Sequence, residues 1–260
     1  MTARDTAKVP MVTFGFWVIK ILATTLGETG GDAVSMSWLG ETTPEAGASG
    51  VNGYLVGTLI FGVLFAVLAA VQIRARRFSA ALYWATIIAS TTVGTTLADF
   101  ATRSLGLGYP GGSLLLLALV LVTLAGWRAQ LGTVAVESVH EPRAESWYWL
   151  TITFSQTLGT ALGDWAADSN VYGFAGAAGL FGAALAIVAL LYLATGVSRV
   201  LLFWMAFILT RPLGAAVGDF LDKPVAKGGL EFSRSLASAV LLGAIVGLVL
   251  LQQRKERVRN

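Results

Sequence analysis

Four aspartates recur at the same position of a repeated block of sequence, and acids that recur in this way indicate cation chemistry. The blocks align without gaps and cover residues 16–32, 83–99, 148–164 and 203–219. Each block has Trp at its second position and ends fifteen residues later on one of four acids: Asp32, Asp99, Asp164 and Asp219. Identities at so many fixed offsets predict a fourfold internal repeat. Inside a membrane such acids usually face a pathway, a partner or a water-filled cavity, because burying a charge there is costly.

Most blocks also carry polar residues one and two helical turns before the aspartate. Four positions before it stand Glu28, Thr95, Thr160 and Ala215. Seven positions before it stand Thr25, Thr92, Thr157 and Pro212, and eight before it stand Thr24, Thr91, Gln156 and Arg211. Residues at these spacings share one face of an α-helix. If the four helices gather around the repeat axis, their carboxylates should converge on one site.

Oxygen atoms are the ligands that such a site would offer. The chain has no Cys, and its single His, His140, lies in a polar stretch that we expect to be a solvated loop. Carboxylate, hydroxyl and carbonyl oxygens suit Mg²⁺, Ca²⁺ and Mn²⁺. We therefore expect a cation site that draws its ligands from Asp32, Asp99, Asp164, Asp219, Glu28, Thr95 and Thr160.

The first and fourth blocks depart from the repeat. Glu28 adds an acid to the first, and the fourth carries Arg211 followed by Pro212. We expect Arg211 to be an internal counter-ion for the acids, with a contact to phosphate or another anion as the alternative. Pro212 should kink or end its helix, and Lys20, which has no basic equivalent in the other blocks, should extend to the membrane surface. These departures favour a carrier with one asymmetric site over a fourfold channel.

The charge of the expected site suggests how it works. The four aspartates and Glu28 would carry five negative charges, and Arg211 with Lys20 would leave about three of them. Like-charged carboxylates in a low-dielectric site resist simultaneous ionisation, so some should be protonated when the metal is absent. We therefore expect a transporter that exchanges a hard divalent cation for protons, with Mn²⁺ export as the specific hypothesis.

Other functions stay open at this point. A carrier for a small organic cation would use the same acids together with the Trp residues. An intramembrane aspartyl enzyme would need two opposed aspartates, which the repeat supplies, but the sequence has no nucleophile-elbow, Walker, zinc-protease or nucleotide-binding motif. We expect neither enzyme activity nor a cofactor. In a structural or regulatory membrane protein, the third alternative, the aspartates would cap helices and Thr would serve helix packing. In every case we expect the Gly residues that precede the aspartates to let the helix backbones approach closely.

The composition places the blocks in a membrane. Of the 260 residues, 55% are hydrophobic and 13% are charged, whereas about 25% are charged in a typical soluble domain. Two apolar spans per repeat predict an all-α protein of eight transmembrane helices, whose four parallel two-helix repeats are related by pseudo-symmetry about the membrane normal. Each Trp should lie at the cytoplasmic interface, and each Asp about 22 Å further along the helix, in the outer half of the membrane.

The basic residues predict the orientation of the chain. One set of span ends holds twelve Lys and Arg residues: Arg4, Lys8, Arg74, Arg76, Arg77, Arg128, Arg143, Arg199, Arg254, Lys255, Arg257 and Arg259. The opposite ends hold four, Arg103, Lys223, Lys227 and Arg234. Cytoplasmic loops carry the excess of Lys and Arg, so both termini should be cytoplasmic. We expect a multi-pass protein of the bacterial cytoplasmic (inner) membrane that contacts the lipid bilayer and a cation substrate and no nucleic acid; an oligomer stays open.

The arrangement resembles a bacterial family of uncharacterised membrane proteins that consist of four tandem two-helix repeats of unknown function, each with a characteristic Trp. The Asp positions above and four tryptophans carry the resemblance over nearly the whole chain: Trp17, Trp84, Trp149 and Trp204. The resemblance implies the architecture and no activity. We predict a single membrane domain over residues 1–260, with repeats at about 11–78, 79–143, 144–197 and 198–253 and a basic cytoplasmic tail at 254–260.

Overall fold

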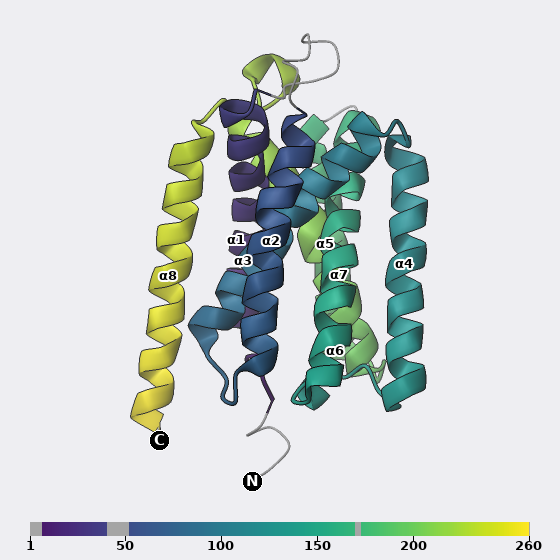
Figure 1. Cartoon of the computed structure of the whole chain (residues 1–260), viewed down its shortest axis with the longest axis vertical. Helices are drawn as coiled ribbons and strands as arrows, with labels where there is room; N and C mark the ends of the chain where they lie inside the picture. The colour runs from purple at the N-terminus through teal and green to yellow at the C-terminus, as the bar shows by residue number, and fades with distance from the viewer. Residues whose placement is uncertain (1–6, 41–51, 170–172, 260) are drawn as a thin grey trace.

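Eight long α-helices make up most of the structure (Figure 1). The computed structural model describes residues 7–40, 52–169 and 173–259. The helices are α1 (Phe14–Asp32), α2 (Gly53–Arg74), α3 (Ala80–Asp99), α4 (Gly108–Leu131), α5 (Pro142–Ser169), α6 (Gly173–Ala194), α7 (Arg199–Asp222) and α8 (Arg234–Arg259). π-Helical turns continue two of them, η2 (Ala33–Trp38) after α1 and η4 (Phe100–Ser104) after α3, and 3-10 turns form η5 (Val136–Ser138) and η6 (Val225–Lys227). The described residues contain no strand, so the all-α fold class is confirmed.

The four odd-numbered helices form a closed ring. α1 packs against α3 and α7, and α5 packs against the same two helices from the other side. Each even-numbered helix lies outside the ring and packs mainly on the odd helix of the following repeat, so that α2 covers α3, α4 covers α5, α6 covers α7, and α8 returns to α1. The chain enters the ring and leaves it at one end, where α1 begins and α8 ends (Figure 1).

Short polar side chains start several of these helices. Thr13, Asn52, Ser79 and Ser198 precede α1, α2, α3 and α7, and each accepts a hydrogen bond from the backbone N–H three residues later. Such caps satisfy N–H groups that have no partner within the helix. Three of the capped helices, α1, α3 and α7, are ring helices, so local sequence signals set where these three helices begin.

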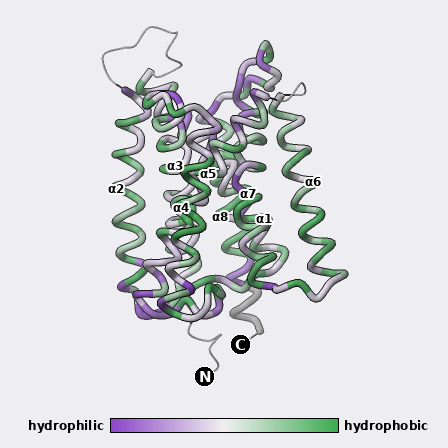
Figure 2. Tube along the Cα trace, turned by 90° about the vertical axis from the view of Figure 1, so that its right-hand side faces the viewer, coloured by the Kyte–Doolittle hydropathy of each residue, from purple (hydrophilic) through white to green (hydrophobic). Residues whose placement is uncertain are grey.

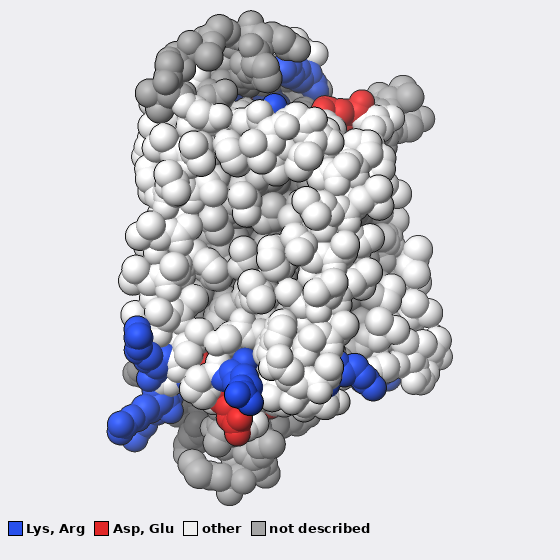
Figure 3. Space-filling view, turned by 45° about the vertical axis from the view of Figure 1, so that its right-hand side comes forward, with Lys and Arg blue, Asp and Glu red and all other residues white. Residues whose placement is uncertain are grey.

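Five helices are long and apolar enough to cross a membrane: α2, α4, α6, α7 and α8. The outer helices α2 and α6 are apolar along most of their length, and polar residues gather at the two ends of the molecule (Figure 2). One face shows a wide band without charged side chains between those ends (Figure 3). The structure is therefore that of a membrane protein. The other three ring helices, α1, α3 and α5, carry the polar stripes, so composition does not identify them as spans.

Glycines allow the ring helices to approach one another closely. The glycine five residues before each aspartate faces the residue eight before the aspartate in the next repeat. The four contacts are Gly27 with Thr91, Gly94 with Gln156, Gly159 with Arg211 and Gly214 with Thr24. A Cβ atom at any of the four glycines would lie within 2.9 Å of that neighbour. The expectation that these small residues serve close helix packing is confirmed.

A ring of aromatic side chains fills the end of the bundle where the odd helices begin. The aromatic residue before each Trp contacts the Trp of the next repeat, and the ring closes on itself. The ring centroids are 5.4 Å apart for Phe16 and Trp84, 5.8 Å for Tyr83 and Trp149, 6.3 Å for Tyr148 and Trp204, and 5.7 Å for Phe203 and Trp17. Three of the tryptophans are buried among the helices, so they do not face lipid at this end of the bundle, and their expected position at the cytoplasmic interface stays a prediction. They stabilise contacts between repeats.

The structure also describes the helix around Pro212 and the C-terminal residues. α7 runs through Pro212 without ending there, because its packing between α1 and α5 holds the helix together where the proline removes one hydrogen bond. α8 continues to Arg259, so most of the predicted tail lies on a helix. Of the twelve basic residues, Arg4 lies outside the described residues, as do the side chains of Lys255, Arg257 and Arg259.

The glycine contacts predict a stability difference between two matched substitutions. Gly214→Ala would place its Cβ atom 2.1 Å from Thr24 Oγ1 and 2.9 Å from the Thr24 carbonyl carbon, so we expect destabilisation by about 1–3 kcal/mol. Gly182→Ala on α6 has nothing within 4 Å and should cost nothing, because alanine favours helix over glycine. Thermal unfolding of the purified variants in detergent measures both. Equal midpoints for the two variants would contradict the close packing of α1 and α7.

Candidate functional site

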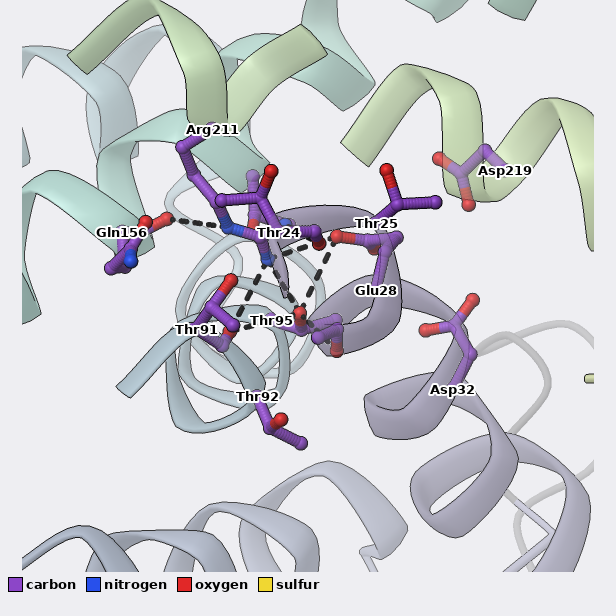
Figure 4. Close-up of polar contacts among 12 residues, drawn as sticks. Thr24, Thr25, Glu28, Asp32, Thr91, Thr92, Thr95, Gln156, Arg211 and Asp219 are labelled. Carbon is purple, nitrogen blue, oxygen red and sulfur yellow. Dashed lines mark hydrogen bonds and ion pairs between the residues drawn. The ribbon is translucent and has the colours of Figure 1, made fainter. Parts of the chain in front are cut away.

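Arg211 extends from α7 into the centre of the helix ring, where its side chain is fully buried (Figure 4). Its guanidinium group donates hydrogen bonds to backbone carbonyls of the three other ring helices. Nη1 bonds Thr24 on α1 at 3.0 Å, Nη2 bonds Thr91 on α3 at 3.3 Å, and Nε bonds Gln156 on α5 at 3.3 Å. These three residues occupy the position of Arg211 in their own repeats. The guanidinium therefore lies where the four repeats meet.

A second set of equivalent positions completes the shell of Arg211. Nη2 lies 2.9 Å from Glu28 Oε2 and donates to Thr95 Oγ1 at 2.6 Å and to Thr160 Oγ1 at 2.5 Å. Each of these acceptors stands four residues before the aspartate of its repeat. Thr95 and Thr160 are predicted from the sequence as ligands of a cation site, whereas in this structure both hydroxyl oxygens accept from Arg211. Glu28 is the acid that pairs with Arg211.

One glycine makes room for this arrangement. A Cβ atom at Gly159 would lie 2.2 Å from Cγ and 2.4 Å from Cβ of Arg211. Any larger residue at this position would push the arginine out of the ring, or push α5 away from α7. The glycine of the third repeat and the arginine of the fourth are therefore a matched pair.

The threonines seven positions before the aspartates do not face the guanidinium. Thr25, Thr92 and Thr157 each donate to the carbonyl oxygen four residues earlier in their own helix. Such local bonds satisfy a buried hydroxyl without a partner on another helix. The polar stripe seen in the sequence therefore divides into positions that face the axis and positions that bond to their own backbone.

Two basic side chains bridge the four aspartates in pairs. Arg103 lies 3.2 Å from Asp99 Oδ1 through Nε and 3.1 Å from Asp164 Oδ2 through Nη2. Lys223 Nζ lies 3.0 Å from Asp219 Oδ1 and also forms an ion pair with Asp32 Oδ2. In both cases a base from an even repeat joins its own aspartate to that of the next repeat.

The carboxylates also approach one another across the ring. Oxygens of Glu28, Asp164 and Asp219 all lie within 4.8 Å of one another, and we call these three buried residues the central cluster. Asp32 and Asp219 lie beyond Glu28 as seen from Arg211 (Figure 4). Asp99 is connected to the central cluster through Arg103. The four aspartates therefore do not converge on one point as expected. They form a network that is connected through Arg103 and Lys223.

Some carboxylate oxygens in this network have no protein partner. Asp32 Oδ1 and Asp164 Oδ1 are buried and accept no hydrogen bond from the described residues. Buried polar atoms in folded proteins are nearly always paired. An unpaired carboxylate oxygen inside a ring of helices is available to a proton, a water molecule or a cation.

Lys20 is the remaining charged residue of the ring interior. Its Nζ lies 3.4 Å from Gln156 Oε1 and 4.2 Å from the centre of the Phe207 ring, and the residue is fully buried. The expectation that it extends to the membrane surface is therefore wrong. The amide oxygen of Gln156 and the face of the Phe207 ring stabilise the ammonium group inside the ring.

From the sequence, Arg103 and Lys223 are predicted only as basic residues of the outer loops. Their ion pairs with the aspartates are not predicted. The signal that identifies them is their spacing: each stands four residues after an aspartate, where a helix brings two side chains together. Repeats one and three have Met36 and Asp168 at this position. When Arg103 and Lys223 are counted with Arg211 and Lys20, the five acids leave a net charge of about one negative. Counting only Arg211 and Lys20, as in the expectation from the sequence, leaves about three.

The shell of Arg211 predicts a rescue between two substitutions. Arg211→Ala would leave Glu28 buried without its base, which should destabilise the protein by about 3–5 kcal/mol. Glu28→Gln in the same chain removes that uncompensated charge and should recover part of the loss. Asp99→Asn is the matched control, because the base of Asp99 is Arg103. Thermal unfolding should show rescue by Glu28→Gln alone, and equal rescue by both would contradict the assigned ion pair.

Comparison with known proteins agrees with the fourfold architecture. A family model described as Repeat of Unknown Function (DUF347) matches four successive segments of the chain, at residues 15–78, 82–133, 147–198 and 202–258. No curated protein and no solved structure matches the sequence. The four matched segments contain the aligned Trp and Asp residues and cover most of the chain, and the chain therefore belongs to the DUF347 family of repeats of unknown function.

Proposed function

We propose that this protein is a membrane transporter for a hard divalent cation, with Mn²⁺ as the substrate to test and proton exchange as the coupling. The observation that carries the proposal is the central cluster, whose three buried carboxylates come from α1, α5 and α7 and whose oxygens lie within 4.8 Å of one another. Carboxylate oxygens are hard ligands and suit Mn²⁺, Mg²⁺ and Ca²⁺. The described residues offer neither Cys nor a buried His to a softer metal.

The buried charge inside the helix ring favours transport over a structural role. Nine ionisable side chains lie in this interior: Lys20, Glu28, Asp32, Asp99, Arg103, Asp164, Arg211, Asp219 and Lys223. Each costs free energy to bury in a membrane, so such residues generally mark ion pathways. A network that served only stability would satisfy its buried polar atoms, whereas three carboxylate oxygens of this one, Asp32 Oδ1, Asp99 Oδ2 and Asp164 Oδ1, have no partner among the described residues.

Exchange for protons follows from the balance of charge. Each carboxylate of the central cluster already has one base, since Glu28 pairs with Arg211, Asp164 with Arg103 and Asp219 with Lys223. An arriving divalent ion adds two positive charges, so a base must move away or protons must leave. Protons and the metal compete for the same oxygens. Export of the metal against entering protons is the direction that we propose.

The proposal includes the position of the protein in the membrane. α1 and α3, with 19 and 20 residues, are about 28–30 Å long and match the hydrocarbon core. Ring helices meet protein instead of lipid and therefore tolerate polar residues. We propose eight crossings with repeat axes along the membrane normal, in the bacterial inner membrane with both termini in the cytoplasm. The basic residues at the lower end in Figure 3 support this orientation.

The central cluster predicts which carboxylates transport requires. Asp164→Asn and Asp219→Asn keep the shape of the side chain and remove its charge, so each should lower Mn²⁺ affinity and proton-coupled Mn²⁺ flux by at least about 100-fold, more than the loss of an outer-shell partner. Asp168→Asn is the control, because Asp168 lies one turn further along α5 and is exposed. Flux into proteoliposomes and titration of the purified variants provide the measurements.

The same measurements include a pH series and a second class of substrate. Wild-type Mn²⁺ affinity should fall as the pH falls, because protons occupy the oxygens that the metal needs. Normal flux in both the Asp164→Asn and Asp219→Asn variants would contradict the proposal. Flux of a quaternary ammonium ion without Mn²⁺ flux would instead identify an organic-cation carrier.

Reporter fusions test the eight crossings and their orientation. Alkaline phosphatase, which is active only outside the cytoplasm, should be inactive when fused after Asn260 and active when fused after Gly228, between α7 and α8. The two fusion points lie on opposite sides in the proposed topology. Activity after Asn260 would place the C-terminus outside and contradict the proposed orientation.

A further inference from the structure

We propose a second cation site, the outer site, formed by Asp32, Asp219 and Asp222, in which Lys223 is a tethered occupant that an incoming divalent cation must displace. The inference rests on the proposed function, because the outer site shares Asp219 with the central cluster. It adds a binding position, an entry order and a competing residue that the central cluster does not require.

The outer site has the geometry of a ligand set. Oxygens of Asp32, Asp219 and Asp222 lie within 4.8 Å of one another, and all three residues are buried. Asp32 is fully buried, and its Oδ1 has no partner among the described residues. Asp222 is 6% exposed, and its Oδ1 also has no partner. The cluster therefore offers free oxygens as well as proximity.

Lys223 occupies this set of carboxylates in the present structure. Its Nζ contacts Asp32 Oδ2 and lies 3.0 Å from Asp219 Oδ1, with Met36 Sδ at 3.7 Å as its other partner. The backbone of Lys223 is held separately, because its carbonyl accepts from Glu231 N–H at 3.0 Å and its N–H donates to Asp219 O at 2.9 Å. Rotation about side-chain bonds alone can therefore move the ammonium group away while α7 and the following loop stay in place.

Arg103, the equivalent base of the other bridge, is held more firmly. In addition to Asp99 and Asp164, it donates to the hydroxyl group of Tyr54 at 3.3 Å, and its guanidinium lies 5.9 Å from the centre of the Tyr54 ring. A planar guanidinium with several fixed partners resists displacement, whereas an ammonium on a flexible stem gives up a few contacts. The structure thus combines one fixed bridge with one displaceable bridge.

The charge of the outer site favours a divalent occupant. Its three carboxylates, when ionised, carry three negative charges, and Arg234, 3.4 Å from Asp222 Oδ2, supplies one positive charge. Lys223 supplies a second positive charge, so the three negative charges of the outer site still exceed its positive charges. A divalent ion at the position of the ammonium group would complete the balance. Asp219 belongs to both clusters. The ion can therefore keep Asp219 as a ligand and reach the central cluster by exchanging Asp32 and Asp222 for Glu28 and Asp164.

Titration of purified protein with Mn²⁺ tests the inference through one pair of variants. If Lys223 leaves its carboxylates about a tenth of the time, its removal should strengthen apparent Mn²⁺ affinity about tenfold. Lys223→Met removes the ammonium group and keeps an unbranched apolar stem. Lys227→Met is the matched control, because Lys227 lies in the same loop, is exposed and loses the same charge. Lys223→Gln repeats the test with a polar side chain if the Met variant folds poorly.

A double variant separates the outer site from the central cluster. Asp222→Asn combined with Lys223→Met should cancel the gain in affinity, because Asp222 belongs to the outer site alone. Unchanged affinity in both Lys223→Met and Lys223→Gln, with wild-type protein binding Mn²⁺, would overturn the inference and leave the proposed function standing. A gain that persists in the double variant, or that Lys227→Met reproduces, would also overturn it. Absence of Mn²⁺ binding in wild type and all variants would overturn both proposals.

Discussion

Arg211 places a permanent positive charge in the centre of a ring of four helices, and much of the structure depends on satisfying that charge. The guanidinium reaches a carbonyl on each of α1, α3 and α5 and pairs with Glu28. A buried charge with missing partners would be strongly unfavourable, so the three helices must keep their register with α7. The same constraint requires a glycine at position 159, because only a residue without a side chain leaves space for Arg211.

Packing in this protein is fourfold, whereas charge is not. The glycine contacts and the interlocked aromatic pairs repeat around the whole ring, because each repeat must present the same surface to the next. Among the described residues the basic bridges occur twice, from the second repeat to the third and from the fourth to the first. Symmetric packing thus fixes the helices, and departures from symmetry place single charges between them. A carrier with one site needs such departures, while a fourfold pore does not.

The two ends of the ring also differ. Aromatic side chains fill the end where the odd helices begin, and acids with bound bases lie toward the other end, where π-helical turns follow Asp32 and Asp99 directly. An ion that enters from the acidic end meets carboxylates before it meets the aromatic layer. In the proposed transport cycle, movement of the aromatic layer would open the aromatic end of the ring. Lys223 and the outer site would control the acidic end. In the described conformation the aromatic side chains of neighbouring repeats contact one another at that end.

The sequence by itself determined the repeat, the helical class and which residues share one face of a helix, because equal offsets in four copies indicate equivalent positions in four helices. Trp17, Asp32 and their equivalents could be found in this way, and so could the closely packed glycines. The tertiary structure decided which charges pair. From the sequence, Arg103 and Lys223 are predicted as loop residues and Thr95 and Thr160 as cation ligands. In the structure the two bases pair with aspartates, and Arg211 donates hydrogen bonds to both threonines. Pairing depends on distances between helices far apart in the chain, and spacing along one helix does not encode those distances.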